Sequence, residues 1–342
     1  MCRMTGFGIT VYGCDPDEAR LVRELAPTLG ISATITSAAV SEVGVISVPR
    51  NRCISVGHRS ELSAPVLRAL ADAGVEHVST RSIGLDHIDL RAAEAARIAV
   101  ENVVYAADGV ADYTLMLILM AIRDAREVLG AVERHDFRLG RARGRDLRDM
   151  TVGVIGVGHI GGAVVTRLRA FGCRVLANND GRAVDTAAEL ATLDVLLRES
   201  DVVTLHVPLN AETHHFIGRA QIAAMKPGAI LVNTGRGALV DTGALIAALE
   251  NGKLGGAALD VLEGEEGIFA SDRGTNPIGH PYLPRLLRLP NAVITPHSAY
   301  YTERTLRDTV EQTLLKCVRF ERTRLNAEAR DRDPVRRMFR RA

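Results

Sequence analysis

Three polar residues each follow an apolar run in the second half of the chain. Arg236 comes after GAILVNTG, Glu265 after GGAALDVLEG and His297 after NAVITP. An arginine can hold a carboxylate with two parallel hydrogen bonds and polarise a neighbouring keto oxygen. A histidine can donate a proton to that oxygen, and a carboxylate paired with the histidine favours the charged imidazolium that carries the proton. These residue types suit the reduction of a 2-keto acid.

Each of these residues also has a simpler interpretation. An isolated arginine after a strand is usually a surface charge, a glutamate in EGEEG is usually part of a solvated turn, and an isolated histidine is more often structural than catalytic. The catalytic interpretation gains weight when the chain also binds a hydride donor.

A glycine-rich loop supplies that second observation. The segment VIGVGHIGGAVV has GxGxxG spacing, and it lies between a strand-like run and a helical pattern. The first glycine permits a tight turn, the second lets the backbone approach a pyrophosphate, and the third lets helix and strand pack closely. The N–H groups at the helix start attract phosphate. We therefore predict a dinucleotide site whose loop contacts are Gly156, Gly158, His159, Ile160 and Gly161.

The end of the next strand bears on the choice of dinucleotide. An acidic residue there usually binds the adenosine ribose of NAD, but the run ends in Asn178, Asn179, Asp180, Gly181 and Arg182. Asp180, one position later, remains a candidate for the ribose. Alternatively, Arg182 and Asn179 accommodate the additional phosphate of NADP. We favour NADP tolerance, which predicts turnover with NADPH at least comparable to that with NADH.

Strand-like and helical segments alternate along the chain. Six runs, TVGVIG, CRVLAN, DVVTLHVPL, GAILVNTG, GGAALDVL and NAVITPH, predict a doubly wound parallel sheet with helices on both faces. The first hundred residues, with GITVYG, VGVISV, CISVG and a helical pattern over Pro65–Ala73, predict a smaller α/β unit. A mostly apolar helix is expected over Ala111–Val128, followed by an arginine-rich solvated connector, and a frayed tail from Glu328 onward.

Length and composition narrow the function further. At 342 residues the chain exceeds the roughly 250 to 300 residues at which single cores stop growing, so two domains are expected. A net charge of +1 gives no sign of nucleic-acid binding. Five scattered cysteines without a CxxC pair, no signal-peptide pattern and no membrane-length apolar run predict a cytoplasmic protein with a small-molecule substrate. We expect no metal site.

The motifs together resemble those of the D-isomer-specific 2-hydroxyacid dehydrogenase family over nearly the whole chain. The resemblance is carried by STRSIGLDHIDL, GVADYTLMLIL, VGVIGVGHIG, NTGRGALVDTGAL, LENGKLGGAALDVLEGE and ITPHSAYYTE. Within the family, CISVGHRSE, VVYAADGVADY and PHSAYYTERTLRDTVE are most similar to the VanH-type D-lactate dehydrogenases of vancomycin-resistance gene clusters.

The resemblance implies roles for particular residues. Arg236 would bind the substrate carboxylate and keto oxygen, and Glu265 would orient and charge His297, the general acid in reduction. Further substrate contacts would come from the backbone amides of Ile83 and Gly84 and from Tyr105. Cofactor contacts are implied for His206, Val207, Pro208, Thr234 and Asp260, with Asp260 beside the nicotinamide carboxamide. His206 has an alternative role as a packing residue.

The resemblance also implies the organisation of the chain. Two domains with parallel sheets are expected, with a Rossmann-like cofactor domain (105–300) inserted into a discontinuous substrate domain (1–104 and 301–330) and a flexible tail (331–342). The implied reaction is reduction of pyruvate to D-lactate by NAD(P)H, in a homodimer formed through the helix after Ala111. D-lactate would then enter D-Ala-D-Lac cell-wall precursors, which bind glycopeptides poorly.

Two other functions stay open from the sequence. A dehydrogenase for a larger 2-keto acid, such as 2-ketoisocaproate, has the same motifs, because pocket volume is not readable from one sequence. The same fold also serves a non-catalytic NAD-sensing corepressor, although the presence of Arg236, Glu265 and His297 argues against that function here.

Overall fold

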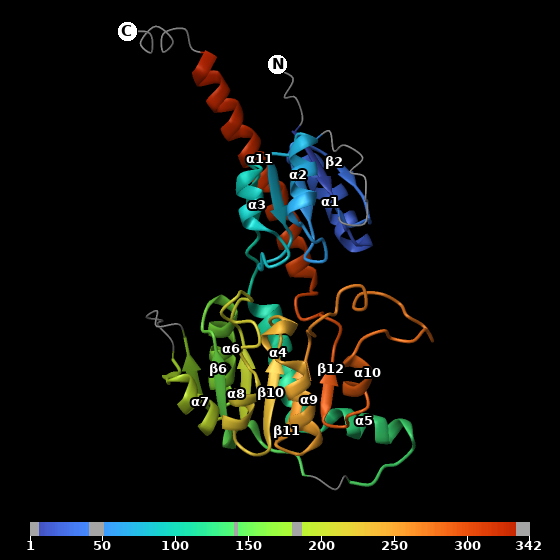
Figure 1. Cartoon of the computed structure of the whole chain (residues 1–342), viewed down its shortest axis with the longest axis vertical. Helices are drawn as coiled ribbons and strands as arrows, with labels where there is room; N and C mark the ends of the chain where they lie inside the picture. Colours follow the sequence, from blue (N-terminus) through green and yellow to red (C-terminus); the bar gives the residue numbers. More distant parts are fainter. Residues whose placement is uncertain (1–6, 41–50, 140–142, 180–186, 333–342) are drawn as a thin grey trace. The chain divides into compact units, whose positions relative to one another are not determined.

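The computed structural model describes residues 7–40, 51–139, 143–179 and 187–332 (Figure 1). The chain divides into two compact units. The discontinuous unit comprises Met1–Ala106 with Glu303–Ala342, and the central unit comprises Ala107–Thr302. Within the described residues, no helix is both long and apolar enough to cross a membrane.

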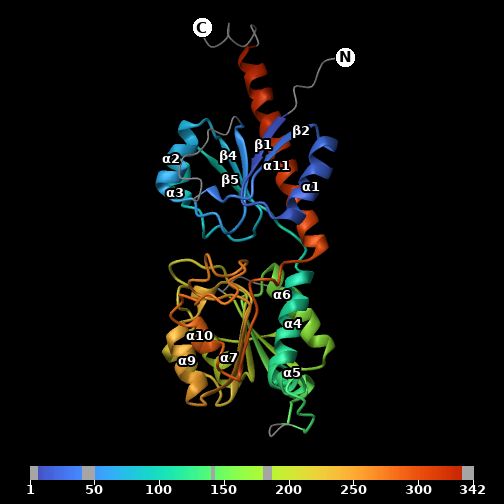
Figure 2. The same cartoon turned by 90° about the vertical axis from the view of Figure 1, so that its right-hand side faces the viewer.

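The discontinuous unit is built on a five-stranded parallel sheet in the order β2-β1-β3-β4-β5. The strands are β1 (Phe7–Val11), β2 (Ile31–Ile35), β3 (Cys53–Val56), β4 (His77–Thr80) and β5 (Ala99–Asn102). Helices α1 (Pro16–Thr28) and α11 (Glu303–Arg332) pack together on one face, and α2 (Ala64–Asp72) and α3 (Leu90–Ala95) on the other (Figure 2).

The sequence predicted only part of this sheet. GITVYG and CISVG are confirmed as β1 and β3, and the expected helix is confirmed as α2. VGVISV lies outside the described residues. The strands β2, β4 and β5 were not predicted, because ISATI, HVST and AVEN carry polar residues in place of an apolar run. In β4 these polar residues are buried and bonded to other elements; for example, Thr313 of α11 donates to Ser79 Oγ at 2.7 Å.

The central unit contains a seven-stranded parallel sheet in the order β12-β11-β10-β9-β6-β7-β8. All six predicted strands are confirmed, and the structure adds the two-residue β8. The strands are β6 (Thr151–Ile155), β7 (Arg174–Asn178), β8 (Glu189–Leu190), β9 (Val202–Leu205), β10 (Ala229–Asn233), β11 (Leu254–Leu259) and β12 (Ala292–Ile294). The direction of winding reverses between β6 and β9, and such a switch point is where an open parallel sheet binds its ligand.

Helices cover both faces of the central sheet and bury two apolar cores (Figures 1 and 2). One core lies under α4 (Asp108–Ile122) and α6 (His159–Ala170). The other lies under α7 (Leu193–Glu199), α8 (Arg219–Ala224), α9 (Thr242–Glu250) and α10 (Leu283–Leu286). The predicted doubly wound architecture is confirmed.

The single helix predicted over Ala111–Val128 is wrong. The chain forms α4 up to Ile122, adopts a left-handed conformation at Asp124 with φ of 48°, and starts α5 (Ala125–Glu133). Arg126 donates to the carbonyl oxygens of Leu289, Ala292 and Leu287, which anchors α5 to distant backbone. An apolar run without glycine or proline gives no local signal for this break.

Two predictions about irregular segments have different outcomes. The described part of the arginine-rich connector is largely exposed, as expected, and Leu147 and Met150 are buried at its end. The frayed tail expected from Glu328 is wrong for its first residues, because α11 continues to Arg332. The remainder of the predicted tail, 333–342, lies outside the described residues.

Candidate active site

Glu265 and His297 form the central contact of the candidate site. They follow β11 and β12, and Glu265 Oε1 is hydrogen-bonded to His297 Nδ1. Both side chains are 15% exposed, so the pair is shielded from water but still accessible. Because Nδ1 is engaged by the carboxylate, Nε2 is the ring nitrogen that can pass a proton to a substrate.

The backbone around this pair holds both side chains in place. Leu262 N donates to Glu265 Oε2 at 2.6 Å, so both carboxylate oxygens accept hydrogen bonds. His297 has a φ of 54°, in the left-handed region that non-glycine residues rarely adopt. Such a conformation persists when surrounding contacts impose it. Here His297 N donates to Asp260 O at 2.7 Å.

Asp260 is fully buried at the end of β11 and bonds residues on both sides of His297. Its Oδ1 accepts from Thr295 Oγ1 at 2.6 Å and from Ser298 N at 2.9 Å. Its Oδ2 accepts from Ala299 N at 2.8 Å. The carboxylate therefore positions the histidine loop, a role that the sequence did not indicate. The contact with the nicotinamide carboxamide stays a prediction.

Arg236 follows β10 on a loop that packs against the loop of the glutamate. Asn233 braces this loop, because its Nδ2 donates to Arg236 O at 2.8 Å and its Oδ1 accepts from Gly235 N at 3.0 Å. A Cβ at Gly237 would lie only 2.0 Å from the carbonyl carbon of Leu262. The glycine after the arginine is therefore required by the close approach of two backbones. The loops that follow β10 and β11 are therefore in contact at Gly237 and Leu262.

The glycine loop between β6 and α6 has the shape that a pyrophosphate site needs. Gly156 has a φ of 86°, and a Cβ there would lie 2.6 Å from His206 O. A Cβ at Gly161 would lie 1.9 Å from Gly156 O. By contrast, nothing lies within 4 Å of a Cβ at Gly158, the residue that caps α6. Two glycines are thus needed by the fold, and the third opens space at a helix N-terminus, which fits a dinucleotide phosphate.

The residues predicted to decide between NAD and NADP are only partly described. Val157 N donates to Asn179 Oδ1 at 3.3 Å, so Asn179 lies beside the glycine loop, as a residue at the end of β7 should. Asp180 and Arg182 lie outside the described residues.

His206 packs against the glycine loop in the central unit. Its Nε2 is 3.0 Å from Thr204 Oγ1, and its Cβ is 3.3 Å from a Cβ built at Gly161. Burial lowers the pKa of His206 to about 4, so the imidazole is neutral near pH 7. The packing alternative is therefore observed, and a cofactor contact stays a prediction.

The other predicted cofactor residues follow β9 and β10 or begin α6. Val207 Cγ1 is 2.7 Å from a Cβ built at Gly156, and Pro208, next along the chain, is exposed. Thr234 is buried and shares a hydrogen bond of 3.0 Å with Thr114 of α4. His159 and Ile160 form the first turn of α6.

The predicted substrate residues of the discontinuous unit follow β4 and β5. Ile83 O accepts from Asn102 Nδ2 at 2.7 Å, and Gly84 O accepts from Ser82 Oγ at 2.8 Å, which fixes this turn. Tyr105 lies half-buried at the end of the segment after β5.

Buried Arg81, at the end of β4, ties this strand to the segment that follows β1. Its Nε lies 2.9 Å from Glu18 Oε1, and its Nη2 donates to Tyr12 O at 2.9 Å. The sequence did not indicate this structural role for Arg81, because Glu18 and Tyr12 lie more than sixty positions earlier in the chain.

Tyr300 is a further residue that the sequence did not single out. Its ring meets the imidazole of His297 edge to face, with centroids 6.0 Å apart and planes at 87°. The aromatic pair in PHSAYYTE was the available signal, but it carried no indication of which ring contacts the histidine.

Comparison with known proteins agrees with this geometry. Residues 115–299 match the D-isomer specific 2-hydroxyacid dehydrogenase, NAD binding domain. The chain is 57% identical over 319 residues to a D-specific alpha-keto acid dehydrogenase of Enterococcus faecium, covering 93% of this chain and 98% of the relative.

Solved structures give the same result. A D-lactate dehydrogenase from Aquifex aeolicus, complexed with NAD and lactic acid, has a TM-score of 0.84 and 32% identity, covering 93% of this chain and 96% of that one. A D-2-hydroxyisocaproate dehydrogenase has a TM-score of 0.80 and 30% identity, covering 92% and 96%. This chain belongs to the D-isomer-specific 2-hydroxyacid dehydrogenase family and is an NAD-dependent D-2-hydroxyacid dehydrogenase.

Proposed function

We propose that the chain is a D-lactate dehydrogenase that reduces pyruvate to D-lactate with NADH or NADPH. The observation that carries the proposal is the hydrogen-bonded pair of Glu265 and His297, next to the loop of Arg236 at the carboxyl ends of β10 to β12. The likeness to a D-lactate dehydrogenase complexed with NAD and lactic acid supports pyruvate and D-lactate as the reactants.

The proposed chemistry assigns one task to each catalytic side chain. Arg236 binds the carboxylate of pyruvate and polarises its keto oxygen. Bound NAD(P)H supplies the hydride that reduces the keto carbon. His297 donates a proton from Nε2 to the oxygen, while Glu265 orients the ring through its hydrogen bond to Nδ1.

The remaining residues would bind rather than react. We assign the discontinuous segment (1–104 with 301–330) to substrate and 105–300 to cofactor. The amides of Ile83 and Gly84 then hold the substrate carboxylate and Tyr105 contacts the substrate. On the cofactor side, Gly158 and the start of α6 bind the pyrophosphate, because the space there is open.

The choice between NADH and NADPH depends on the end of β7. Asn179 is neutral and already accepts a hydrogen bond from Val157 N. It therefore lacks the carboxylate that would select a free ribose hydroxyl and repel a phosphate. We infer that the protein tolerates NADPH at least as well as NADH.

The proposed cellular role is that of a VanH-type enzyme, acting in the cytoplasm to supply D-lactate for D-Ala-D-Lac cell-wall precursors. Its support is the motif resemblance and the 57% identity to D-specific alpha-keto acid dehydrogenases of Enterococcus faecium and Enterococcus faecalis. A role in glycopeptide resistance would follow from the weak binding of glycopeptides to such precursors.

A larger substrate is the second candidate. The structure is similar to that of a D-2-hydroxyisocaproate dehydrogenase, and the sequence is 37% identical to an aromatic 2-oxoacid reductase of Clostridium sporogenes. Branched and aromatic keto acids should therefore be tested as substrates.

We propose that the active form is a homodimer formed through α4, α5 and α6. A groove of about 590 Å³ on these helices is lined mainly by apolar side chains, among them Leu115, Met116, Leu119, Met120 and Phe171. The described residues of α5 bury none of their side chains, and Val128, Leu129 and Val132 are exposed. A second copy would cover this surface.

The direct test is the initial rate of pyruvate-dependent oxidation of NADPH and of NADH, with the lactate enantiomer identified. We expect the product to be D-lactate and the rate with NADPH to be at least equal to the rate with NADH. A higher kcat/KM with 2-ketoisocaproate or phenylpyruvate than with pyruvate would show that the preferred substrate is a larger 2-keto acid. Tight NADH binding without turnover of any keto acid would favour the corepressor-like function instead. Light scattering of the same sample tests the dimer.

A further inference from the structure

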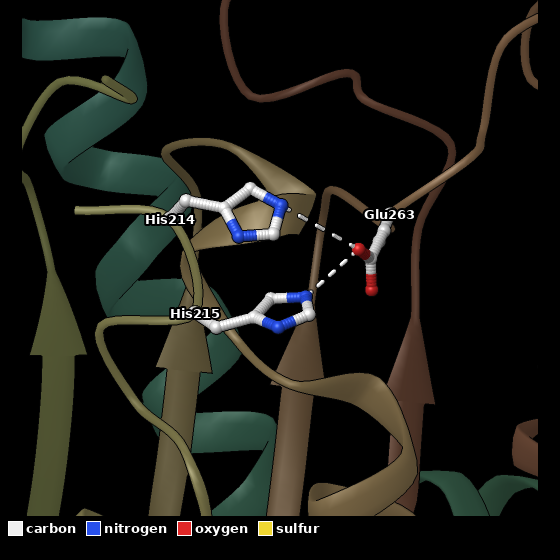
Figure 3. A group of neighbouring side chains, drawn as sticks. All are labelled: His214, His215 and Glu263. Carbon is white, nitrogen blue, oxygen red and sulfur yellow. Dashed lines mark hydrogen bonds and ion pairs between the residues drawn. The ribbon is translucent and has the colours of Figure 1, made fainter. Parts of the chain in front are cut away.

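We propose that His214, His215 and Glu263 form a binding site for one divalent transition-metal ion, with Zn²⁺ as the best-suited ion. Within the described residues these three side chains place one donor atom each within 4.8 Å of one another (Figure 3). Glu263 Oε1 lies 2.8 Å from His215 Nε2 and 4.0 Å from His214 Nε2. The proposal goes beyond the dehydrogenase reaction, which needs none of these residues, and it replaces the expectation from sequence that no metal site exists.

The backbone brings the two adjacent histidines to the same side. His214 and His215 lie in a turn, and His215 has a φ of 51°, in the left-handed region. In this turn the centroids of the two imidazole rings lie 4.1 Å apart, with their planes at 31°. His215 N donates to Ala238 O at 2.8 Å, which holds this segment against the turn that follows Arg236.

Hydrogen bonds from Thr242 and His280 fix the position of Glu263. Thr242 Oγ1, at the start of α9, donates to Glu263 Oε2 at 3.4 Å, so Oε1 is the oxygen presented to the histidines (Figure 3). His280 accepts from Leu283 N at its Nδ1 and therefore donates from Nε2 to Glu263 O at 2.8 Å. Second-sphere hydrogen bonds of this kind orient metal ligands.

The donor set indicates which ions would bind. Two imidazole nitrogens and one carboxylate oxygen are ligands of Zn²⁺, Cu²⁺ or Ni²⁺, whereas Mg²⁺ and Ca²⁺ prefer oxygen donors. Tetrahedral Zn²⁺ at its usual bond lengths separates its ligand atoms by about 3.4 Å. The observed 2.8 and 4.0 Å lie on either side of that value, so small side-chain rotations suffice. Three protein ligands leave one position for water.

Metal binding at this site would act on the catalytic loop. Leu262, next to Glu263, donates its N–H to Glu265 Oε2, and Gly237, next to Arg236, packs against Leu262 and Glu263. A bound ion would tie these loops to the segment of His214 and His215. We infer that it stabilises the loops rather than takes part in hydride transfer.

The experiment titrates Zn²⁺ into the full chain by calorimetry, without thiols or chelators, and repeats the titration with His214→Ala, His215→Ala and Glu263→Gln. His214 is more than half exposed, so its variant is expected to fold normally. One ion per chain is expected for the wild type, with affinity at least about tenfold weaker in each variant. Co²⁺ should give visible absorption bands typical of a tetrahedral site, and these bands should disappear in His215→Ala.

Matched variants control for adventitious binding. His135→Ala and Glu266→Gln change exposed residues of the same types and should bind as the wild type does. His297→Gln changes the histidine that pairs with Glu265 and should also retain the ion. Absence of Zn²⁺ binding, equal binding by Glu263→Gln, or loss of the ion in His297→Gln with retention in His215→Ala would each overturn the proposal.

Discussion

Asp260 and His297 are joined by a backbone hydrogen bond of 2.7 Å, and the buried carboxylate of Asp260 bonds the residues on both sides of the histidine. The left-handed backbone of His297 is therefore imposed by a residue 37 positions earlier in the chain. Asp260 thus holds the backbone of His297, and Glu265 holds its ring through Nδ1.

Asp260→Asn is expected to lower both stability and kcat. The side-chain amide has only one oxygen, so its NH₂ group would face a donor in either orientation. That donor is Ala299 N in one orientation, and Ser298 N with Thr295 Oγ1 in the other. Losing a buried charged hydrogen bond costs about 1.5 to 3 kcal/mol, and a displaced histidine lowers kcat by up to roughly a hundredfold. Thermal unfolding and steady-state kinetics measure the two effects. Unchanged kcat in a folded variant would show that Asp260 does not position His297.

Arg236→Gln and His297→Gln should separate binding from chemistry. The arginine variant loses the fork that holds the substrate carboxylate, so the KM for pyruvate should rise by at least about tenfold. The histidine variant loses the proton donor, so kcat should fall by about 10²- to 10⁴-fold with a smaller change in KM. Near wild-type kcat and KM in both variants would contradict the assigned roles.

Gly158→Ala and Gly161→Ala should impair different properties, cofactor binding in the first variant and stability in the second. A methyl group at Gly158 meets open space, so the variant should fold normally but bind NADH more weakly, by about tenfold or more, if the pyrophosphate lies there. A methyl group at Gly161 would lie 1.9 Å from Gly156 O, which should destabilise the fold by about 1 to 3 kcal/mol. Thermal unfolding and fluorescence titration with NADH distinguish the two. Unaltered NADH affinity in Gly158→Ala would exclude the pyrophosphate from this position.

His206 should make the folded state sensitive to acid. Burial lowers its pKa to about 4 from an ordinary 6.5, so the unfolded chain binds more protons than the folded chain between these values. The stabilisation by neutral His206 is complete above pH 6.5 and is lost as the pH falls toward 4. Between pH 7 and pH 5 the loss is on the order of 1 to 2 kcal/mol.

His206→Asn should remove that part of the pH dependence. Urea unfolding of both proteins at pH 7 and pH 5 gives the difference, with His135→Ala, an exposed histidine, as the control. An identical fall in unfolding free energy for the wild type and His206→Asn would show that the pKa of this histidine is not lowered in the folded state.

Local sequence patterns determined the parts of the protein that depend on neighbouring residues. Apolar runs of strand length predicted β6, β7, β9, β10, β11 and β12, because a strand buried on both faces is apolar throughout. The GxGxxG spacing predicted the loop before α6, because turn geometry is local. Since parallel strands end at the same edge, the positions of Glu265 and His297 after two such runs were enough to predict their meeting.

The tertiary structure decided what depends on residues far apart in sequence. After the break between α4 and α5, Arg126 donates hydrogen bonds to carbonyl groups more than 160 positions away. The polar strand β4 can be buried because α11 supplies a hydrogen-bond partner for it. Asp260 acquires its positioning role, and Glu263 its place beside His214 and His215, only when separate loops pack together. Periodicity reports which face of an element is buried, whereas the identity of the buried partner depends on the folded chain as a whole.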